Sequence, residues 1–241
     1  MKLDCTSLES AQQSLCEIFN ATEIELLALL RSVRPFESMD QRPEDVIYER
    51  FCTQFGAPLY PIKVTWFHGT RVEDLHSFYK YGILPKTEAK NLIEPRLKEL
   101  AIGLKRKGKN PFSSSIAGKQ CEHDEGPFAS LIKDAVVHAP SNHHSYVKAP
   151  EIVEDISGEL LGENYSQLVN RYQKITKPCV VAFLSNARGG EISHALLYLK
   201  HVEDGDSAID AAGYANTFFC ADGEIISPER IQSIEVLNTL A

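Results

Sequence analysis

The sequence predicts an α+β fold, with helices in the first part of the chain and most strands toward its end. Apolar residues recur at helical spacing through the first sixty residues. Four apolar or aromatic runs later in the chain are typical of strands: "CVVAFLS", "ALLYLK", "TFFCA" and "SIEVL". Because strands and helices do not alternate regularly, we expect a mixed or antiparallel sheet and not a doubly wound parallel one.

Composition narrows the class of protein. The 241 residues suit one large domain, or one domain with a small appendage. A net charge of -8 argues against a protein whose entire surface binds nucleic acid, but it is compatible with a local basic patch. Six scattered cysteines, no signal-peptide pattern and no apolar run near the length of a membrane span favour a cytoplasmic protein with reduced thiols.

Three helices are predicted over residues 1–60, which we expect to form a helical N-terminal extension. Capping boxes at Thr6–Glu9 and at Thr22–Glu25 mark the starts of the first two helices. The third helix starts at Pro43, which is tolerated in a first turn, and ends at Gly56.

A strand and a polar trio follow at residue 61. Alternating apolar residues predict a strand that ends in His68-Gly69-Thr70, and Thr70–Glu73 fits a capping box for a helix that ends at Gly82. A histidine at a strand end can project its imidazole into a cleft. Gly69 lets a ligand approach the backbone closely, since it has no Cβ. The alternative is a plain strand-to-helix turn.

Other segments have simpler patterns. The stretch "GPFASLIKDAVVHA" predicts a short strand that runs into a helix, and residues 86–109 predict a basic amphipathic helix. Another helix is expected around Tyr165–Tyr172, and Ser227–Arg230 is typical of a helical turn. A long loop is expected between residues 111 and 126.

The segment from Trp66 to Pro85 resembles the first motif of the ADP-ribosyltransferase superfamily, whose fold is shared by poly(ADP-ribose) polymerases, diphtheria-type toxins and RNA 2'-phosphotransferases. In that family a strand ends in His-Gly-Ser/Thr, and a Gly-hydrophobic-x-Pro exit follows, here Gly82–Pro85. The resemblance implies a split mixed or antiparallel sheet over residues 61–241, with NAD as co-substrate. It also implies that His68 is a catalytic residue that holds the ribose, that the backbone of Gly69 pairs with the nicotinamide amide, and that Thr70 contacts NAD.

The second family motif is similar to Gly126–Ser130 with the helix after it. Many members have a tyrosine there that stacks on the nicotinamide, and this chain has none. His138 is the first candidate for the stacking group, which is similar to the His-His branch that contains the RNA 2'-phosphotransferases, and Phe128 is the second. The resemblance also implies that Ser130 contacts NAD.

The third family motif places a glutamate at the start of a strand, before an Ile-x-Pro-Glu-x-Ile tail. The tail resembles Ile226–Ile231, but the usual glutamate position falls on Asn216 or Thr217. Glu224 and Asp222 are the nearest downstream carboxylates, and Glu191 is a more distant candidate. A carboxylate would stabilise the oxocarbenium-like state of NAD cleavage, and we assign this catalytic role to Glu224.

The resemblance therefore implies an NAD-dependent ADP-ribosyltransferase that modifies a macromolecular acceptor, either protein or nucleic acid. By analogy it would be a toxin or a phage-defence effector, with an inhibitory or antitoxin protein as partner. Two alternatives stay open. One is a non-catalytic module of the same fold that binds NAD or a partner, and the other is an RNA 2'-phosphotransferase.

Two further patterns have competing readings. A zinc site could use Cys121, His123, His138 and the pair His143-His144, but these spacings match no common zinc template, and a polar loop is favoured. Cys121 has acidic neighbours that would raise its pKa, which disfavours a Cys-His protease. The basic run Lys105–Lys109 is either a solvated helix end or a grip for a phosphate backbone or the NAD pyrophosphate.

Overall fold

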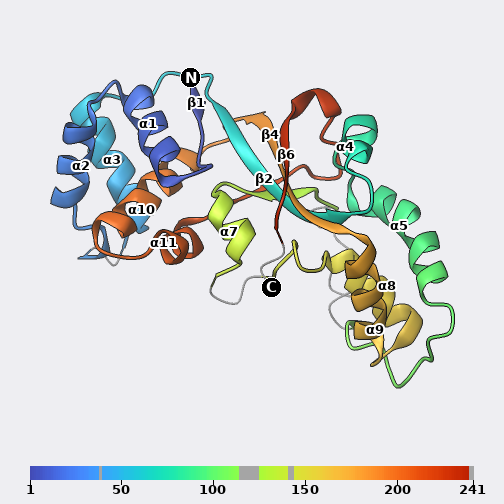
Figure 1. Cartoon of the computed structure of the whole chain (residues 1–241). Helices are drawn as coiled ribbons and strands as arrows, with labels where there is room; N and C mark the ends of the chain where they lie inside the picture. Colours follow the sequence, from blue (N-terminus) through green and yellow to red (C-terminus); the bar gives the residue numbers. More distant parts are fainter. Residues whose placement is uncertain (38–39, 114–124, 141–143, 239–241) are drawn as a thin grey trace. The chain divides into compact units, whose positions relative to one another are not determined.

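The computed structural model describes residues 1–37, 40–113, 125–140 and 144–238 (Figure 1). It confirms an α+β fold. The chain forms two compact units, each assembled from three stretches of sequence. The first unit comprises Met1–Phe67, Ser130–His144 and Phe183–Phe218, and the second comprises His68–Ala129, Ser145–Ala182 and Phe219–Ala241.

The strands form one sheet in the order β5-β3-β2-β4-β6, with β1 paired to β2. β1 runs parallel to β2, and β2 runs antiparallel to β3 with Phe67 opposite Ser130, so the sheet is mixed. Strands β2, β3, β4 and β5 each have residues in both units. In the described part of the chain, the strands are β1 (Lys2–Leu3), β2 (Lys63–Val72), β3 (Phe128–Ser130), β4 (Lys177–Asn186), β5 (Phe218–Cys220) and β6 (Ile231–Val236).

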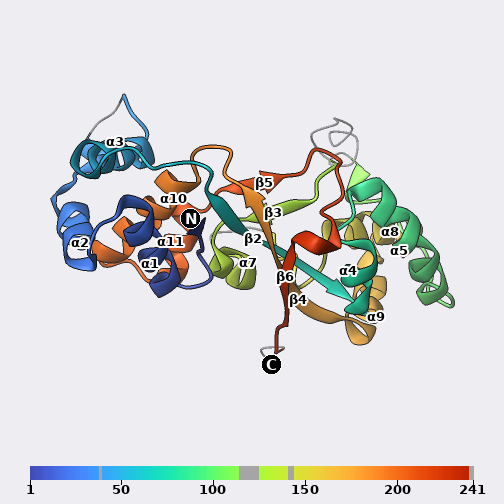
Figure 2. The ribbon, with the colours of Figure 1, turned by 90° about the horizontal axis from the view of Figure 1, so that it is seen from above.

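Helix α10 lies at the centre of the helices of the first unit, where it contacts α1, α2, α3 and α11 (Figures 1 and 2). Nine of its 13 residues are buried, because a helix with helices on several sides must be apolar on several faces. The helical elements of this unit are α1 (Leu8–Phe19), α2 (Glu23–Ser32), η1 (Pro35–Glu37), α3 (Pro43–Phe55), α7 (Lys133–His138), α10 (Glu191–Glu203) and α11 (Ala208–Ala215).

Two predictions for the first unit were wrong in detail. The run "ALLYLK" is the middle of α10 and not a strand, because a fully buried helix and a buried strand both give an unbroken apolar run. The cap of α1 is Ser7, which pairs with Ser10, so the capping box does not run from Thr6 to Glu9. The capping box of α2 and the helix Pro43–Phe55 are confirmed.

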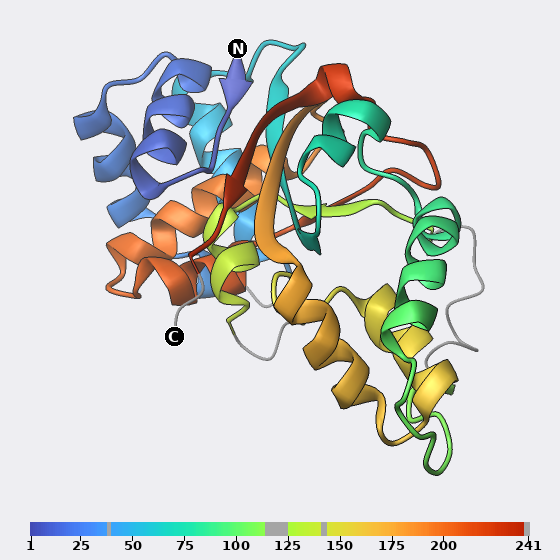
Figure 3. The same ribbon diagram turned by 45° about the vertical axis from the view of Figure 1, so that its right-hand side comes forward.

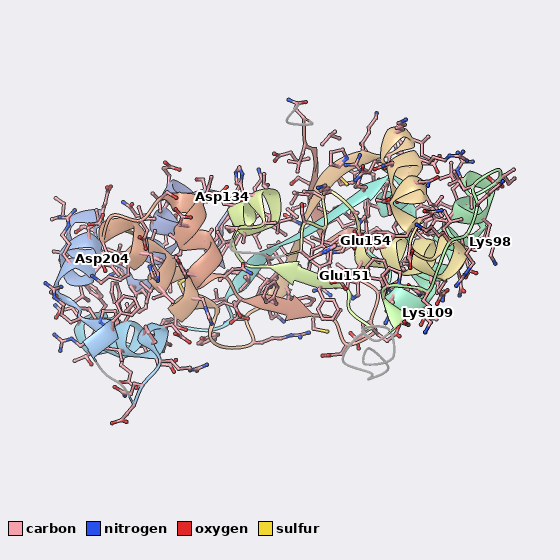
Figure 4. All side chains as sticks on the ribbon, turned by 90° about the horizontal axis from the view of Figure 1, so that it is seen from below. Lys98, Lys109, Asp134, Glu151, Glu154 and Asp204 are labelled. Atoms are coloured by element: carbon pink, nitrogen blue, oxygen red, sulfur yellow. The ribbon has the colours of Figure 1, made fainter. Side chains whose placement is uncertain are left out.

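In the second unit, α5, α8 and α9 pack on one another (Figure 3). Its helical elements are α4 (His76–Tyr81), α5 (Lys86–Leu100), α8 (Glu151–Leu161), α9 (Tyr165–Ile175) and η3 (Pro228–Arg230). Glu151 and Glu154 lie in the first turn of α8 and Lys98 in the last turn of α5, where each charge suits the helix dipole (Figure 4). The core of the three helices consists of Leu97, Val153, Ile156, Leu161, Leu168 and Tyr172.

The predicted capping box at Thr70–Glu73 was wrong. Strand β2 continues through Val72, and α4 starts only at His76, whose N–H donates to the side chain of Asp74. Glu73 instead accepts two hydrogen bonds from Arg96. The strand is longer than predicted because Arg71 is buried and anchored by hydrogen bonds, which keeps the backbone extended past the polar trio.

Within the described ranges, no helix has both the length and the apolar character needed to cross a membrane. The five cysteines that the structure describes are free thiols. Cys121 lies outside the described residues, as does most of the predicted loop between residues 111 and 126.

Candidate functional site

His68 lies on β2 and is half-buried. Its Nδ1 lies 2.7 Å from the carbonyl oxygen of Phe128. A carbonyl oxygen can only accept, so Nδ1 carries the proton and donates it. Burial lowers the pKa of His68, and the hydrogen bond to Phe128 opposes that shift. The imidazole is therefore neutral near pH 7, and its Nε2 offers a lone pair to a ligand hydroxyl.

We call residues Glu125–Phe128 the connecting segment. Its consecutive backbone carbonyls accept hydrogen bonds that link all three motif regions in the second unit. Lys86 donates its N–H to the first carbonyl at 2.9 Å, and Gly223 donates to the second at 2.7 Å. Ala221 donates to the third at 3.1 Å, and His68 donates to the fourth. The segments of the resemblance, distant in sequence, are therefore hydrogen-bonded to one four-residue stretch.

Two features fix the shape of the connecting segment. Gly126 has φ +59°, and a Cβ there would lie 3.0 Å from the ring of Phe128, so glycine lets the ring fold back over the backbone. The Glu125 carboxylate accepts the N–H of Thr87 at 3.1 Å, in the first turn of α5. This bond satisfies an amide that the helix leaves unpaired.

The exit of the first motif pairs directly with the third. Ile83 and Ile226 exchange two backbone hydrogen bonds of 2.9 and 3.0 Å as an antiparallel bridge. Gly82 ends α4 with φ +74°, and a Cβ there would lie 2.0 Å from the carbonyl oxygen of Ile226. Only glycine fits, so the predicted glycine at the end of this helix is confirmed and has an additional cause.

The turn Ala221–Glu224 presents two carboxylates. The N–H of Glu224 donates to the carbonyl of Ala221 at 3.0 Å, which closes the turn, and Asp222 has φ +52°. The side chain of Glu224 is exposed, and no residue in the described part of the chain binds it. Its carboxylate is therefore available to a ligand.

Glu191, the other candidate carboxylate, has a structural role. It is 4% exposed, and its two oxygens accept the N–H groups of Arg188 and Gly189, each at 2.8 Å. It lies in the first unit, at the first residue of α10, where a negative charge suits the helix dipole. Both oxygens are thus occupied by backbone amides.

The remaining predicted ligand contacts fall into two groups. In the second unit, Phe128 keeps 40% of its surface exposed, so its ring can stack on a ligand, while Gly69 is buried and Thr70 half-buried on β2. In the first unit, Ser130 is buried opposite Phe67, and His138 is exposed at the end of α7. Among these residues, the structure brings only His68 and Phe128 into a direct hydrogen bond.

Sequence reasoning missed the role of Arg71. Its guanidinium is buried and donates to the side chain of Thr176 and to the carbonyls of Val147, Gln173 and Thr176, at 2.9 to 3.1 Å. The Tyr172 hydroxyl donates to the Arg71 carbonyl at 2.8 Å. These bonds hold β2 three residues beyond His68. No sequence signal marks them, because the partners are more than seventy residues away.

Asn216 has a structural role at the position where the family keeps its glutamate. Its Oδ1 accepts the N–H of Ile132 at 3.1 Å, between β3 and α7. The neighbouring Thr217 accepts the N–H of Leu131 through its carbonyl at 3.0 Å. The pair therefore positions the β3–α7 connection within the first unit.

The basic run is bound to the end of α8. Lys107 forms a parallel bridge with Gly162, and Arg106 donates to the carbonyl of Glu159. Lys109, which follows this bridge, is labelled in Figure 4. The ammonium of Lys107 lies 3.9 Å from Glu163 and stays exposed. The backbone of the run is thus fixed while its charges face solvent, and a role in phosphate binding stays a prediction.

Within the described ranges, no group of three or more His, Cys, Asp or Glu side chains could hold a metal ion. Cys121, His123 and His143 of the zinc hypothesis lie outside those ranges.

No protein-family model, curated protein or solved structure matches this chain. The candidate site is therefore defined by the chain's own residues.

Proposed function

We propose that the protein is an NAD-dependent ADP-ribosyltransferase that transfers ADP-ribose from NAD to a macromolecular acceptor, with residues 61–241 as its catalytic part. The observation that carries this proposal is the connecting segment. Its four consecutive carbonyls accept hydrogen bonds from His68, from Lys86, which follows the exit, and from the turn that holds Glu224. A single stretch thus connects His68, Phe128 and the turn of Glu224, while Ser130 and His138 lie in the first unit.

His68 and Phe128 supply complementary surfaces for NAD. The Nε2 of a neutral His68 accepts a hydrogen bond from a ribose hydroxyl, and its orientation is fixed by the bond from Nδ1 to Phe128. The exposed ring of Phe128 offers a flat apolar face for the nicotinamide. These residues fit the two halves of a nicotinamide riboside.

Glu224 is the proposed catalytic carboxylate. Cleavage of the nicotinamide–ribose bond leaves its electron pair on nicotinamide and positive charge on the ribose. An unpaired carboxylate stabilises that charge. The acceptor nucleophile then bonds to the ribose carbon and releases its proton, which Glu224 or solvent takes. Glu191 cannot replace it without breaking its two amide hydrogen bonds.

The test is to incubate the protein with NAD labelled in its adenylate phosphate and a cell lysate, and then to separate protein from nucleic acid. We expect label in one fraction, and its loss in His68→Ala. The matched control is His76→Ala, because His76 is an exposed histidine of the same unit. Full transfer by His68→Ala would overturn the site.

The same assay separates the alternatives. Bound NAD with neither label transfer nor NAD loss would show a non-catalytic module. Nicotinamide release that requires an RNA 2'-phosphate, with loss of that phosphate, would show an RNA 2'-phosphotransferase. Label in nucleic acid that disappears when the charges of Lys105–Lys109 are reversed would assign the acceptor and the basic run together.

A further inference from the structure

The first unit contains a cavity of about 430 Å³. It lies among the end of α2, the η1 turn and the end of α10, where Asp204 is labelled in Figure 4. Its lining combines three cations with an apolar surface. The lining residues include Arg31, Arg34, Pro35, Phe36, Lys200 and Asp204.

Lys200 is a buried cation with incomplete pairing. Its side chain is 2% exposed, and its ammonium donates to Asp204 at 2.5 Å. An ammonium has three N–H donors, and in the described part of the chain Asp204 is the one partner of this group. A buried charge with incomplete pairing is costly, and a ligand with acceptor oxygens in the cavity would complete the pairing.

Arg34 adds a second set of unused donors. Its Nη1 donates to the carbonyls of Arg31 and Val33 at 2.6 and 3.3 Å, which fixes the guanidinium. Its Nε and Nη2 have no acceptor among the described residues. Arg31 is paired with Glu203 at 2.7 Å. Three cations thus face two carboxylates, Glu203 and Asp204, and one positive charge is left over.

An apolar surface borders these charges. Phe36 is 55% exposed, and its ring centroid lies 5.5 Å from that of His201. The cavity volume lies in the range of small-ligand sites and exceeds what a lone phosphate fills. A guanidinium and an ammonium together can bind several oxygens at once. A phosphate ligand offers more such oxygens than a carboxylate ligand does.

We propose that this cavity binds a phosphate monoester with a planar or apolar body. The phosphate oxygens accept hydrogen bonds from Lys200 and Arg34, and the body covers Phe36. The site lies in the first unit, and its lining includes none of the residues of the proposed NAD site.

Calorimetric titration with adenosine monophosphate, adenosine and inorganic phosphate tests this proposal. We expect the monophosphate to bind at least ~10-fold more tightly than either of the other two, since each lacks one half of the recognition. Arg34→Met should weaken its binding at least ~10-fold, and Lys200→Met more. Arg50→Met, an exposed arginine on α3 of the same unit, is the matched control.

The outcome that overturns the proposal is unchanged affinity in Arg34→Met, a surface change that leaves the core intact even where Lys200→Met fails to fold. The proposal would also be overturned if adenosine bound as tightly as adenosine monophosphate, or if inorganic phosphate did. Retained binding in His68→Ala distinguishes this cavity from the proposed NAD site.

Discussion

Two short loops in this chain, 188–191 and 221–224, look alike in sequence and differ in what they do with a glutamate. Gly189-Gly190-Glu191 and Asp222-Gly223-Glu224 both place a carboxylate after a glycine of positive φ. Glu191 is buried, and two backbone amides bind its oxygens. Glu224 is exposed, and its turn is bound to the connecting segment instead.

The difference has a physical cause. Glu191 is the first residue of a long helix, where a negative charge suits the helix dipole, and its oxygens bind two amides of the loop before that helix. Glu224 precedes the bridge between Ile83 and Ile226, so the backbone of its turn is satisfied without its side chain. A carboxylate that completes its own loop stabilises the fold, whereas a carboxylate left over by a well-bonded turn is available for chemistry.

The largest effect should come from Glu224→Gln. Loss of the charge removes stabilisation of the oxocarbenium-like state, and we expect the transfer rate to fall at least ~100-fold with an unchanged melting temperature. The matched control is Asp222→Asn, which keeps a residue that tolerates the same φ. A comparable loss of rate in Asp222→Asn would move the catalytic role to the other carboxylate of the turn.

Gly82→Ala tests the bridge that holds this turn. A Cβ would meet the Ile226 carbonyl oxygen at 2.0 Å, so we expect a loss of unfolding free energy of about 2 kcal/mol beyond the backbone cost. Gly103→Ala is the control that measures the backbone cost without a steric contact, because Gly103 has φ +82° and open space around it. Denaturant unfolding measures both, and equal losses would show that the bridge yields without strain.

Glu191→Gln should have a structural effect. The amide keeps one acceptor oxygen and loses the charge, so we expect the free energy of unfolding to fall by about 1–2 kcal/mol. The transfer rate per folded molecule should not change. Glu49→Gln, an exposed glutamate of α3, is the control for loss of charge alone. A stable Glu191→Gln variant with a reduced rate would reverse the two roles.

The smallest effect is a dependence of stability on pH. Burial lowers the pKa of His68 from 6.5, so the unfolded chain binds a proton there more readily than the folded one. Stability contributed by this group should therefore rise with pH through the window just below 6.5 and be fully present above it. Unfolding curves across pH 5–8 for the protein and for His68→Gln measure the difference. It should vanish if folding leaves the pKa of His68 unchanged, and reverse its sign if the imidazole is protonated in the fold.

Local patterns predicted the parts of the fold that depend on neighbours in sequence. The cap at Thr22, the helix from Pro43 and the glycine at residue 82 follow from spacing and backbone preference. Long-range packing decided the rest. The apolar run at residues 195–199 is helical because other helices surround it. Strand β2 continues beyond Thr70 because carbonyls distant in sequence bind Arg71.

The candidate site divides in the same way. The strand-end pattern and the resemblance single out His68, and the resemblance gives Phe128 as the second candidate for the stacking group. A hydrogen bond joins His68 to the carbonyl of Phe128. The connecting segment was not predictable, since its bonds use backbone carbonyls, which every residue has, and reach up to 97 positions along the chain. The different roles of Glu191 and Glu224 depend on just such bonds.

The most direct test of this account is nicotinamide release from NAD, measured per folded molecule in one assay for the unmodified protein, Glu224→Gln and Glu191→Gln. We expect release by the unmodified protein, the same rate for Glu191→Gln, and a rate at least ~100-fold lower for Glu224→Gln. No release by the unmodified protein, or a loss confined to Glu191→Gln, would contradict it.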